Sequence, residues 1–169
     1  MKTLWAPWRM AYILSDQKES RCIFCPGPNR DTDESRLILY VGELSMVMMN
    51  RFPYINGHLL VAPSRHVKGL ESLSEEEMLD LLTMVSRSID ILRNVMSPEG
   101  FNVGMNLGKV AGAGVEDHMH FHIVPRWNGD NNYMTVFGEV RVIPEHIEKT
   151  YRRLLPHFRE LNVVHGGEE

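Results

Sequence analysis

The segment DHMHFHIVPRW, residues 117–127, constrains the fold of this chain more than any other stretch, because histidine and apolar residues alternate along it. The histidines are His118, His120 and His122. The apolar residues are Met119, Phe121, Ile123 and Val124. A β-strand sends successive side chains to opposite faces, so the segment predicts a strand with three imidazoles on one face and apolar side chains on the core side. Pro125 is expected to end this strand, because proline cannot donate to the ladder.

Three neighbouring imidazoles that titrate near neutral pH indicate an active site. One interpretation is a metal site, in which the histidines ligate zinc and leave a position open for water, with Glu116 or Asp117 as a nearby acid. The other is nucleophilic catalysis, in which one imidazole attacks phosphorus and its neighbours orient it or protonate the leaving group. A merely polar face is the plain structural alternative. Spacing alone does not separate the two chemical interpretations.

Length and composition favour one domain with a real core, since the chain has 169 residues and 43% hydrophobic content. The net charge of −4 gives no basic field for a nucleic-acid polymer. The first residues lack a signal-peptide pattern, and no stretch approaches the roughly 20 apolar residues of a membrane span. Both cysteines lie in a single CxxC, which favours a reducing cytoplasm over a disulfide scaffold.

The remaining pattern predicts an α+β fold with a mainly antiparallel sheet, because a hairpin, a strand, a long helix and a strand pair follow one another. The other strands are expected at 36–41, 44–50, 58–63 and 101–107, the first two joined by a Gly42-Glu43 turn. The long helix starts at Ser74, where Ser74 and Glu77 fit a capping box, and ends at the Ser97–Gly100 turn. Its predicted buried stripe is Met78, Leu81, Leu82, Val85, Ile89, Leu92 and Met96. A short C-terminal helix is expected to start at Pro144 and to bury Ile147, Tyr151 and Leu154.

Cys22 and Cys25 form a second group with possible chemistry. They could be a redox pair, half of a zinc site or two small buried side chains. A closed structural zinc site needs four ligands, so two cysteines alone do not establish one.

These motifs resemble the histidine triad family of nucleotide hydrolases and transferases. DHMHFHIVPRW is similar to the family signature, NRFP through GHLLV (50–61) to its first conserved block, and 73–96 to its long helix. The resemblance covers about residues 22–127, and the following RWNGDNNYM resembles bacterial members related to diadenosine tetraphosphate phosphorylases and hydrolases. It implies one histidine triad domain over 1–169, with an N-terminal aromatic arm (1–21) and a C-terminal extension (128–169).

The resemblance also implies roles for individual residues. His120 would attack the α-phosphorus and form a nucleotidyl-histidine intermediate, His122 would contact the scissile bridge or phosphate, and His58 would line the same pocket. Asn50 would hold the ribose hydroxyls and Asn106 the phosphate oxygens. Independently of the resemblance, the Gly112–Gly114 backbone can approach phosphate closely and offer N–H donors.

The family further implies a structural zinc held by two cysteines and two histidines. In this sequence the ligands would be Cys22, Cys25, His66 and His118. A homodimer with a sheet continuing across both subunits is implied as well.

The sequence departs from several eukaryotic members, which carry glutamine or serine where Gly114 and Val115 stand. Glu116 and Asp117 also put negative charge beside the expected phosphate pocket.

The resulting expectation is an enzyme acting on dinucleoside polyphosphates or related adenylyl compounds. A zinc metallohydrolase using all three histidines and a non-catalytic nucleotide-binding protein remain the alternatives.

Overall fold

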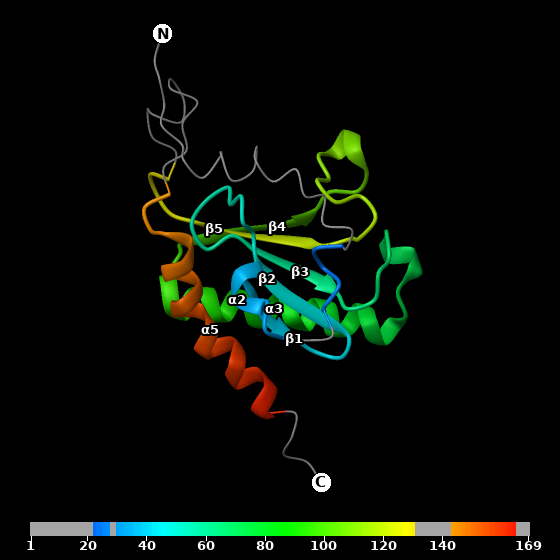
Figure 1. Cartoon of the computed structure of the whole chain (residues 1–169). Helices are drawn as coiled ribbons and strands as arrows, with labels where there is room; N and C mark the ends of the chain where they lie inside the picture. Colours follow the sequence, from blue (N-terminus) through cyan, green and yellow to red (C-terminus); the bar gives the residue numbers. More distant parts are fainter. Residues whose placement is uncertain (1–21, 28–29, 131–142, 165–169) are drawn as a thin grey trace.

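The computed structural model describes residues 22–27, 30–130 and 143–164, and its centre is a five-stranded sheet (Figure 1). The strand order is β1-β2-β3-β5-β4, and every neighbouring pair is antiparallel. The strands are β1 (Ile38–Val41), β2 (Ser45–Met49), β3 (Leu59–Pro63), β4 (Gly100–Met105) and β5 (Phe121–Arg126). This architecture confirms the predicted α+β class with an antiparallel sheet.

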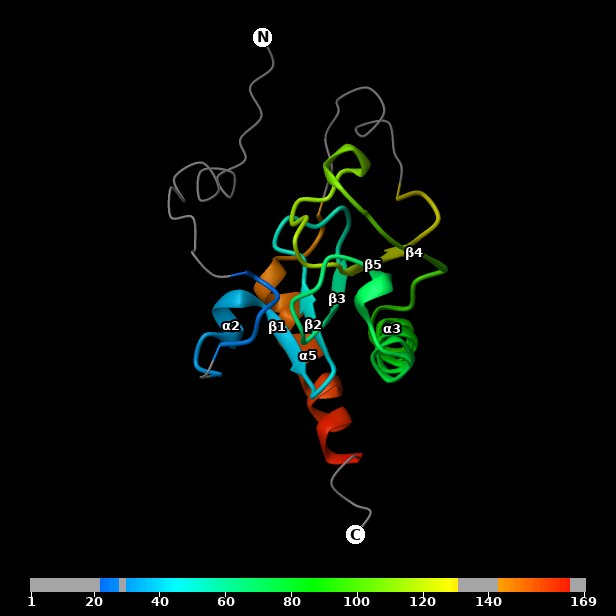
Figure 2. The ribbon, with the colours of Figure 1, turned by 90° about the vertical axis from the view of Figure 1, so that its right-hand side faces the viewer.

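Two long helices pack on the sheet; of three short helical segments, one precedes the first strand and two lie in the connections. The long helices are α3 (Glu75–Met96), beside the sheet in Figure 2, and α5 (Ile147–Val164). The short segments are α2 (Asp33–Arg36), η1 (Leu70–Ser72) and η2 (Lys109–Ala111). α3 contacts β2, β3 and β5, whereas α5 contacts β1 and α3. None of the described helices is long and apolar enough to cross a membrane.

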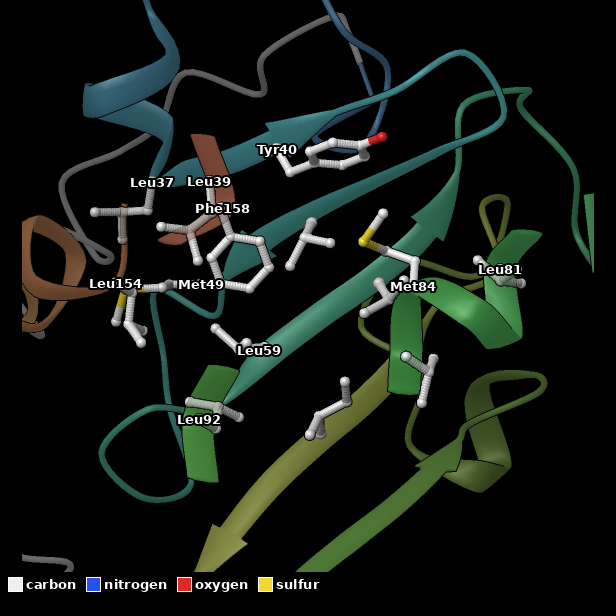
Figure 3. Packing of buried hydrophobic residues seen from close by; sticks show 14 of the residues in the cluster. Leu37, Leu39, Tyr40, Met49, Leu59, Leu81, Met84, Leu92, Leu154 and Phe158 are labelled. Atoms are coloured by element: carbon white, nitrogen blue, oxygen red, sulfur yellow. The ribbon is translucent and has the colours of Figure 1, made fainter. Parts of the chain in front are cut away.

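The sheet buries apolar side chains on both faces. In β2, β3 and β5 the odd-numbered residues point toward α3 and α5 and form the larger core (Figure 3). Members of this core are Val47, Met49, Leu59, Val61, Ile123, Leu81, Met84, Leu92, Leu154 and Phe158. On the opposite face a smaller cluster contains Phe24, Ile38, Met46, Met48, Leu60 and Ala62. Burial on both faces explains why β2 and β3 are almost continuously apolar in sequence.

The predicted stripe of α3 is partly wrong. Leu81, Val85 and Leu92 are buried as expected, but Met78 and Leu82 are 36% and 56% exposed. The centre of the buried face passes through Met84, which the prediction omitted. Leu82 stands two residues from Met84, hence about 200° around the helix axis. The apolar residues of this helix are compatible with a buried face through Leu82 or with one through Met84. Packing against the sheet buries the face through Met84.

All five strands differ from their predicted bounds, and β5 starts only at Phe121, after His118 and His120. Two of the differences have a clear physical reason. The first strand begins at Ile38 instead of Arg36, because Arg36 ends α2 and Leu37 caps that helix with a φ of 61°. β5 continues through Pro125 to Arg126. The Arg126 carbonyl accepts from the Glu99 N–H at 2.9 Å, so even-numbered residues here direct their peptide groups toward β4. The backbone of Pro125 therefore faces the β3 side, but the pairing with β3 starts at Leu59 opposite Ile123, so Pro125 lies beyond it and no ladder bond is required.

The C-terminal helix is longer than predicted and begins at Ile147, three residues after Pro144. Tyr151 and Leu154 are buried in the larger core, as expected. The predicted aromatic arm with Trp5, Trp8 and Tyr12 lies outside the described residues, as does His165.

The predicted capping box of α3 is confirmed and extends into a longer network. Ser74 Oγ accepts from the Glu77 N–H at 3.2 Å, and Glu77 Oε2 accepts from the Ser74 N–H at 2.7 Å. Arg65 donates to both oxygens of Glu77 at 2.8 and 2.7 Å and to the Ser72 carbonyl at 2.6 Å. The start of α3 is thereby fixed to the segment that carries His66.

We expect Glu77→Gln to lower the Tm at pH 7 more than Glu76→Gln, which removes an exposed carboxylate from the same helical turn. The hydrogen bond from Arg65, followed by that from the Ser74 backbone, lowers the pKa of Glu77 from 4.5 to about 2. A depressed pKa means that the carboxylate stabilises the fold above pH 4.5 and that this contribution disappears as the pH falls toward 2. Thermal melts between pH 2 and 7 should show the two variants converging in acid, and equal melting temperatures at pH 7 would contradict the role of Glu77.

Candidate active site and metal centre

The three histidines of residues 117–127 lie on the sheet face opposite α3 and α5. His122 belongs to β5, opposite Gly104 of β4 and Leu60 of β3, whereas His118 and His120 lie in the extended chain just before it. The rings of His120 and His122 meet edge to face at 4.9 Å between centroids. Met119 and Ile123 point into the helix-side core, with Phe121 packed against it. The predicted alternation therefore holds, except that it puts Val124 on the histidine face.

His120 is held by one hydrogen bond and one ring contact. Its Nδ1 lies 3.0 Å from the His118 carbonyl oxygen, which can only accept, so Nδ1 carries the proton of the neutral ring. Nε2 is then left with a lone pair. The ring of Phe24 stacks on His120 with centroids 4.5 Å apart and an angle of 28°. The buried imidazole thus has a fixed orientation and one basic nitrogen.

His122 takes its tautomer from a chain of hydrogen bonds that starts at the backbone. The Tyr54 N–H donates to His58 Nδ1 at 3.1 Å, so in the neutral ring the proton of His58 is on Nε2. His58 Nε2 lies 2.9 Å from His122 Nδ1 and donates to it. The proton of a neutral His122 is therefore on Nε2, the nitrogen that the chain leaves available. The neighbouring rings of His120 and His122 consequently offer one lone pair and one N–H donor.

Asn50, directly after β2, belongs to the same chain of hydrogen bonds. Its Oδ1 accepts from the Phe52 N–H at 2.9 Å, which identifies the other amide atom as nitrogen. That Nδ2 lies 3.3 Å from His58 Nδ1, and the ring of His58 is completely buried. Gly57, with a φ of 78°, permits the turn that brings the Tyr54 N–H back to His58. Asn50 and His58, predicted to share one pocket, are thus in direct contact.

Burial keeps the triad neutral. Desolvation lowers the pKa of His118 and that of His120 below 6.5. For His122, desolvation and then the neighbouring His120 lower the pKa to about 4. At pH 7 the imidazoles are therefore uncharged, as a nitrogen nucleophile must be.

The two cysteines lie beside His118 and His66. Cys22 Sγ is 3.3 Å from His118 Nδ1, and Cys25 Sγ is 3.3 Å from His66 Nδ1 and 3.8 Å from His118 Nδ1. All four ligand atoms lie within 4.8 Å of one another. His118 Nε2 donates to the Pro63 carbonyl at 2.8 Å, so Nδ1 presents its lone pair to the thiols. Among the described residues, these four side chains form the one group of three or more His, Cys, Asp or Glu residues placed closely enough to hold a metal ion.

The donor set fits zinc. A tetrahedral ion with Zn–S bonds of about 2.3 Å and Zn–N bonds of about 2.0–2.1 Å separates its ligand atoms by about 3.3–3.8 Å. The S–N distances of 3.3 and 3.8 Å in this cluster fall in that interval. Cys₂His₂ is also a donor combination typical of structural zinc. The cluster includes His118 but neither His120 nor His122.

The predicted phosphate-side residues form a loop at the end of β4. Asn106 follows β4 and donates through Nδ2 to the Gly112 carbonyl at 3.3 Å. Gly112 has a φ of 88° and closes η2, while Gly114 is exposed between η2 and the triad segment. Asp117, expected to put charge beside the pocket, pairs with Lys68 at 2.6 Å. The structure therefore joins Asn106 to the glycine-rich loop but shows no contact of Gly114 with the histidines.

Two aromatic residues of this site were not predicted. Phe24 lies inside the CxxC and contacts both His118 and His120, whereas Tyr54 contacts both His58 and His122. The sequence signal for Phe24 was an apolar residue between two potential zinc ligands. The signal for Tyr54 was an aromatic residue four positions before a histidine. Each contact with the triad joins residues distant in sequence, so no local period reveals it.

Comparisons with known proteins agree with this geometry. The sequence model of the HIT domain matches residues 32–129. An AP-4-A phosphorylase of Mycobacterium tuberculosis H37Rv is 38% identical over 162 residues, which cover 92% of this chain and 83% of that protein. The asymmetrical bis(5′-nucleosyl)-tetraphosphatase of Schizosaccharomyces pombe is 32% identical over 132 residues, covering 78% of this chain and 69% of that enzyme.

Solved structures share the fold. A zinc-bound histidine triad family protein from Mycobacterium smegmatis superposes with a TM-score of 0.60 at 26% identity. The alignment covers 76% of this chain and 87% of that protein. Sequence, sheet topology and the clustered histidines lead to one conclusion: the chain belongs to the HIT, or histidine triad, family.

Proposed function

We propose that this protein is a nucleotidyl hydrolase or transferase that cleaves dinucleoside polyphosphates or related adenylyl compounds. The observation that carries the proposal is the pair of fixed tautomers, with a lone pair on His120 Nε2 beside an N–H on His122 Nε2. A nucleophile and a proton donor on adjacent rings are the two groups needed to displace a phosphate ester. The similarity to an AP-4-A phosphorylase and to a bis(5′-nucleosyl)-tetraphosphatase supports the substrate class.

In the first step His120 Nε2 attacks the α-phosphorus. A P–N bond forms, the bridging P–O bond breaks, and the polyphosphate leaves as its anion with a hydrogen bond from the His122 Nε2–H to the leaving oxygen. The positive charge that develops on the His120 ring lies next to the His118 carbonyl, which accepts from Nδ1–H at 3.0 Å. That carbonyl therefore stabilises the nucleotidyl-histidine intermediate.

In the second step water or inorganic phosphate attacks the same phosphorus and the P–N bond breaks. The electron pair of the P–N bond returns to His120 Nε2, which restores the neutral ring, and the proton of the attacking acceptor is released to solvent. Covalent catalysis of this kind replaces one difficult displacement by two easier ones. Asn50 is proposed to hold the ribose hydroxyls, and Asn106 with the N–H of Gly114 to hold the phosphate oxygens. The Gly112 N–H, also expected to bind phosphate, instead donates to the Lys109 carbonyl at 2.9 Å.

The cysteine–histidine cluster is proposed to bind a structural zinc ion. The ligands would be Cys22, Cys25, His66 and His118. When bound, the ion would supply a cross-link between the CxxC loop, the end of β3 and the triad segment. His118 Nε2 is engaged by the Pro63 carbonyl and Nδ1 faces the thiols, so this histidine is not oriented toward a site shared with His120 and His122. This argues against a catalytic zinc on all three triad histidines.

We further propose a cytoplasmic homodimer built from one histidine triad domain per chain. Zinc-binding thiols must stay reduced, which fits a reducing compartment. The edge strand β4 pairs with β5 on one side and exposes Val103, and a second copy could extend the sheet there. The packing of Tyr151 and Leu154 of α5 into the main core argues for one domain.

Replacement of the nucleophile tests the chemistry directly. We expect His120→Ala to lower kcat on diadenosine tetraphosphate by about a thousandfold or more, while His146→Ala, at an exposed histidine, has no effect. Phosphoramidate bonds survive alkali, so intact mass after an alkaline quench should show an adenylyl adduct on wild type and none on His120→Ala. A fully active His120→Ala protein would eliminate His120 as nucleophile, and substrate binding without turnover in wild type would favour a binding protein.

The hydrogen-bond role of His122 predicts a dependence on the leaving group. We expect His122→Ala to slow cleavage of adenosine 5′-phosphoramidate, whose amine is a poor leaving group, by about 10²- to 10³-fold. Adenosine 5′-(p-nitrophenyl phosphate) has a good leaving group that needs little stabilisation, and its cleavage should fall far less. Steady-state rates for both compounds measure the difference, and equal losses would refute stabilisation of the leaving group by His122.

The zinc proposal predicts one zinc per chain by elemental analysis and a lower Tm after its removal. Cys22→Ser and Cys25→Ser should lose the metal and melt earlier, whereas His157→Ala, at an exposed position on α5, should retain both properties. Chelation should reduce activity in step with unfolding. A rapid loss of turnover from chelated but folded protein would instead support zinc as the catalytic group.

A further inference from the structure

Tyr54 lies at the rim of the active site with its side chain 45% exposed. Its ring is 4.6 Å from the ring of His58, at an angle of 42°, and 5.9 Å from that of His122, at 17°. The described residues contain two exposed Phe, Tyr or Trp side chains, Tyr54 and Phe52, and both belong to the turn between β2 and β3. Aromatic rings exposed beside a polar site offer a surface on which a base can stack.

The turn that carries Tyr54 is held at several points. The Tyr54 N–H is bonded to His58, and the Phe52 N–H to Asn50. Further along, the buried Asn56 side chain lies 2.9 Å from the hydroxyl of Thr150 in α5. The ring is therefore carried by an ordered backbone, which lowers the entropy that a ligand must overcome on binding.

The two ends of the histidine cluster are covered by different aromatic rings. Phe24 stacks on His120, whereas the ring contacts of Tyr54 are with His58 and His122. In a displacement at phosphorus the attacking and leaving atoms stand roughly in line. His122, which donates to the leaving oxygen, is the triad ring that Tyr54 contacts, so the leaving group lies at the Tyr54 end of the cluster.

We propose that Tyr54 stacks against the nucleobase of the leaving nucleotide of a dinucleoside polyphosphate. The inference rests on the proposed function, since it takes His120 as nucleophile and His122 as donor to the leaving oxygen. It adds a binding site for the second nucleoside. Such a site selects dinucleoside polyphosphates over nucleotides that carry phosphate alone. Stacking of a base on an aromatic side chain contributes about 1–3 kcal/mol, or roughly 5- to 150-fold in affinity.

The test compares two substrates that differ only in the second nucleoside, diadenosine tetraphosphate and adenosine 5′-tetraphosphate. The readout is the ratio of their kcat/KM values, because damage to the shared chemistry cancels in the ratio. We expect Tyr54→Leu to lower this ratio about 5- to 150-fold. Tyr54→Phe, which retains the ring, should keep it. Leu79→Ala, at an exposed apolar residue of α3, is the matched surface control and should also keep it.

The outcomes separate the inference from the function on which it rests. An unchanged ratio in Tyr54→Leu, with both nucleotides consumed, overturns the stacking site and leaves the nucleotidyl-transfer proposal intact. Consumption of neither nucleotide by wild type overturns both. A thermal melt of each variant checks folding. If the branched side chain of Tyr54→Leu prevents folding, Tyr54→Met takes its place.

Discussion

The alternation of side chains across the antiparallel sheet is the constraint on which the rest of this structure depends. In β2, β3 and β5 one set of residues packs under α3 and α5, and the other set faces the CxxC loop. His122 belongs to the second set, and His58, His118 and His120, which lie just before β3 or β5, continue it. A shift of register by one residue would bury the histidines under the helices and expose the core, so hydrophobic packing on one face fixes the active site on the other.

Electrostatic preorganisation is built on that geometry by backbone groups. A carbonyl sets the tautomer of His120 and an amide N–H, acting through His58, sets that of His122. Neither requires a charged residue to orient the imidazoles. The tautomer of His120 is set by a main-chain carbonyl, which cannot change protonation state near neutral pH, whereas that of His122 is relayed through the buried ring of His58.

Local sequence periods predicted much of this arrangement. Alternation over residues 117–123 gave the histidine face, and the Ser74–Glu77 spacing gave the start of α3. One error arose because the local pattern fitted two buried faces of α3 equally well, one with Leu82 and one with Met84. Another arose at Pro125, which was expected to end its strand but lies where no ladder hydrogen bond is needed. The metal ligands needed family resemblance because His118 lies 96 residues from Cys22. The contacts of Phe24 and Tyr54 with the triad could not be inferred, because ring stacking between distant segments leaves no period in sequence.

The link between Thr150 and Asn56 bears on where a functional unit of this family ends. The HIT sequence model stops at residue 129, yet α5 supplies Leu154 and Phe158 to the main core and its Thr150 supports the turn before His58. A minimal fragment cut at that boundary would retain every triad histidine but lose the support of the turn that sets their protonation. In this chain the segment after residue 129 is thus part of the scaffold that supports the histidine cluster, although it lies outside the match to the HIT domain.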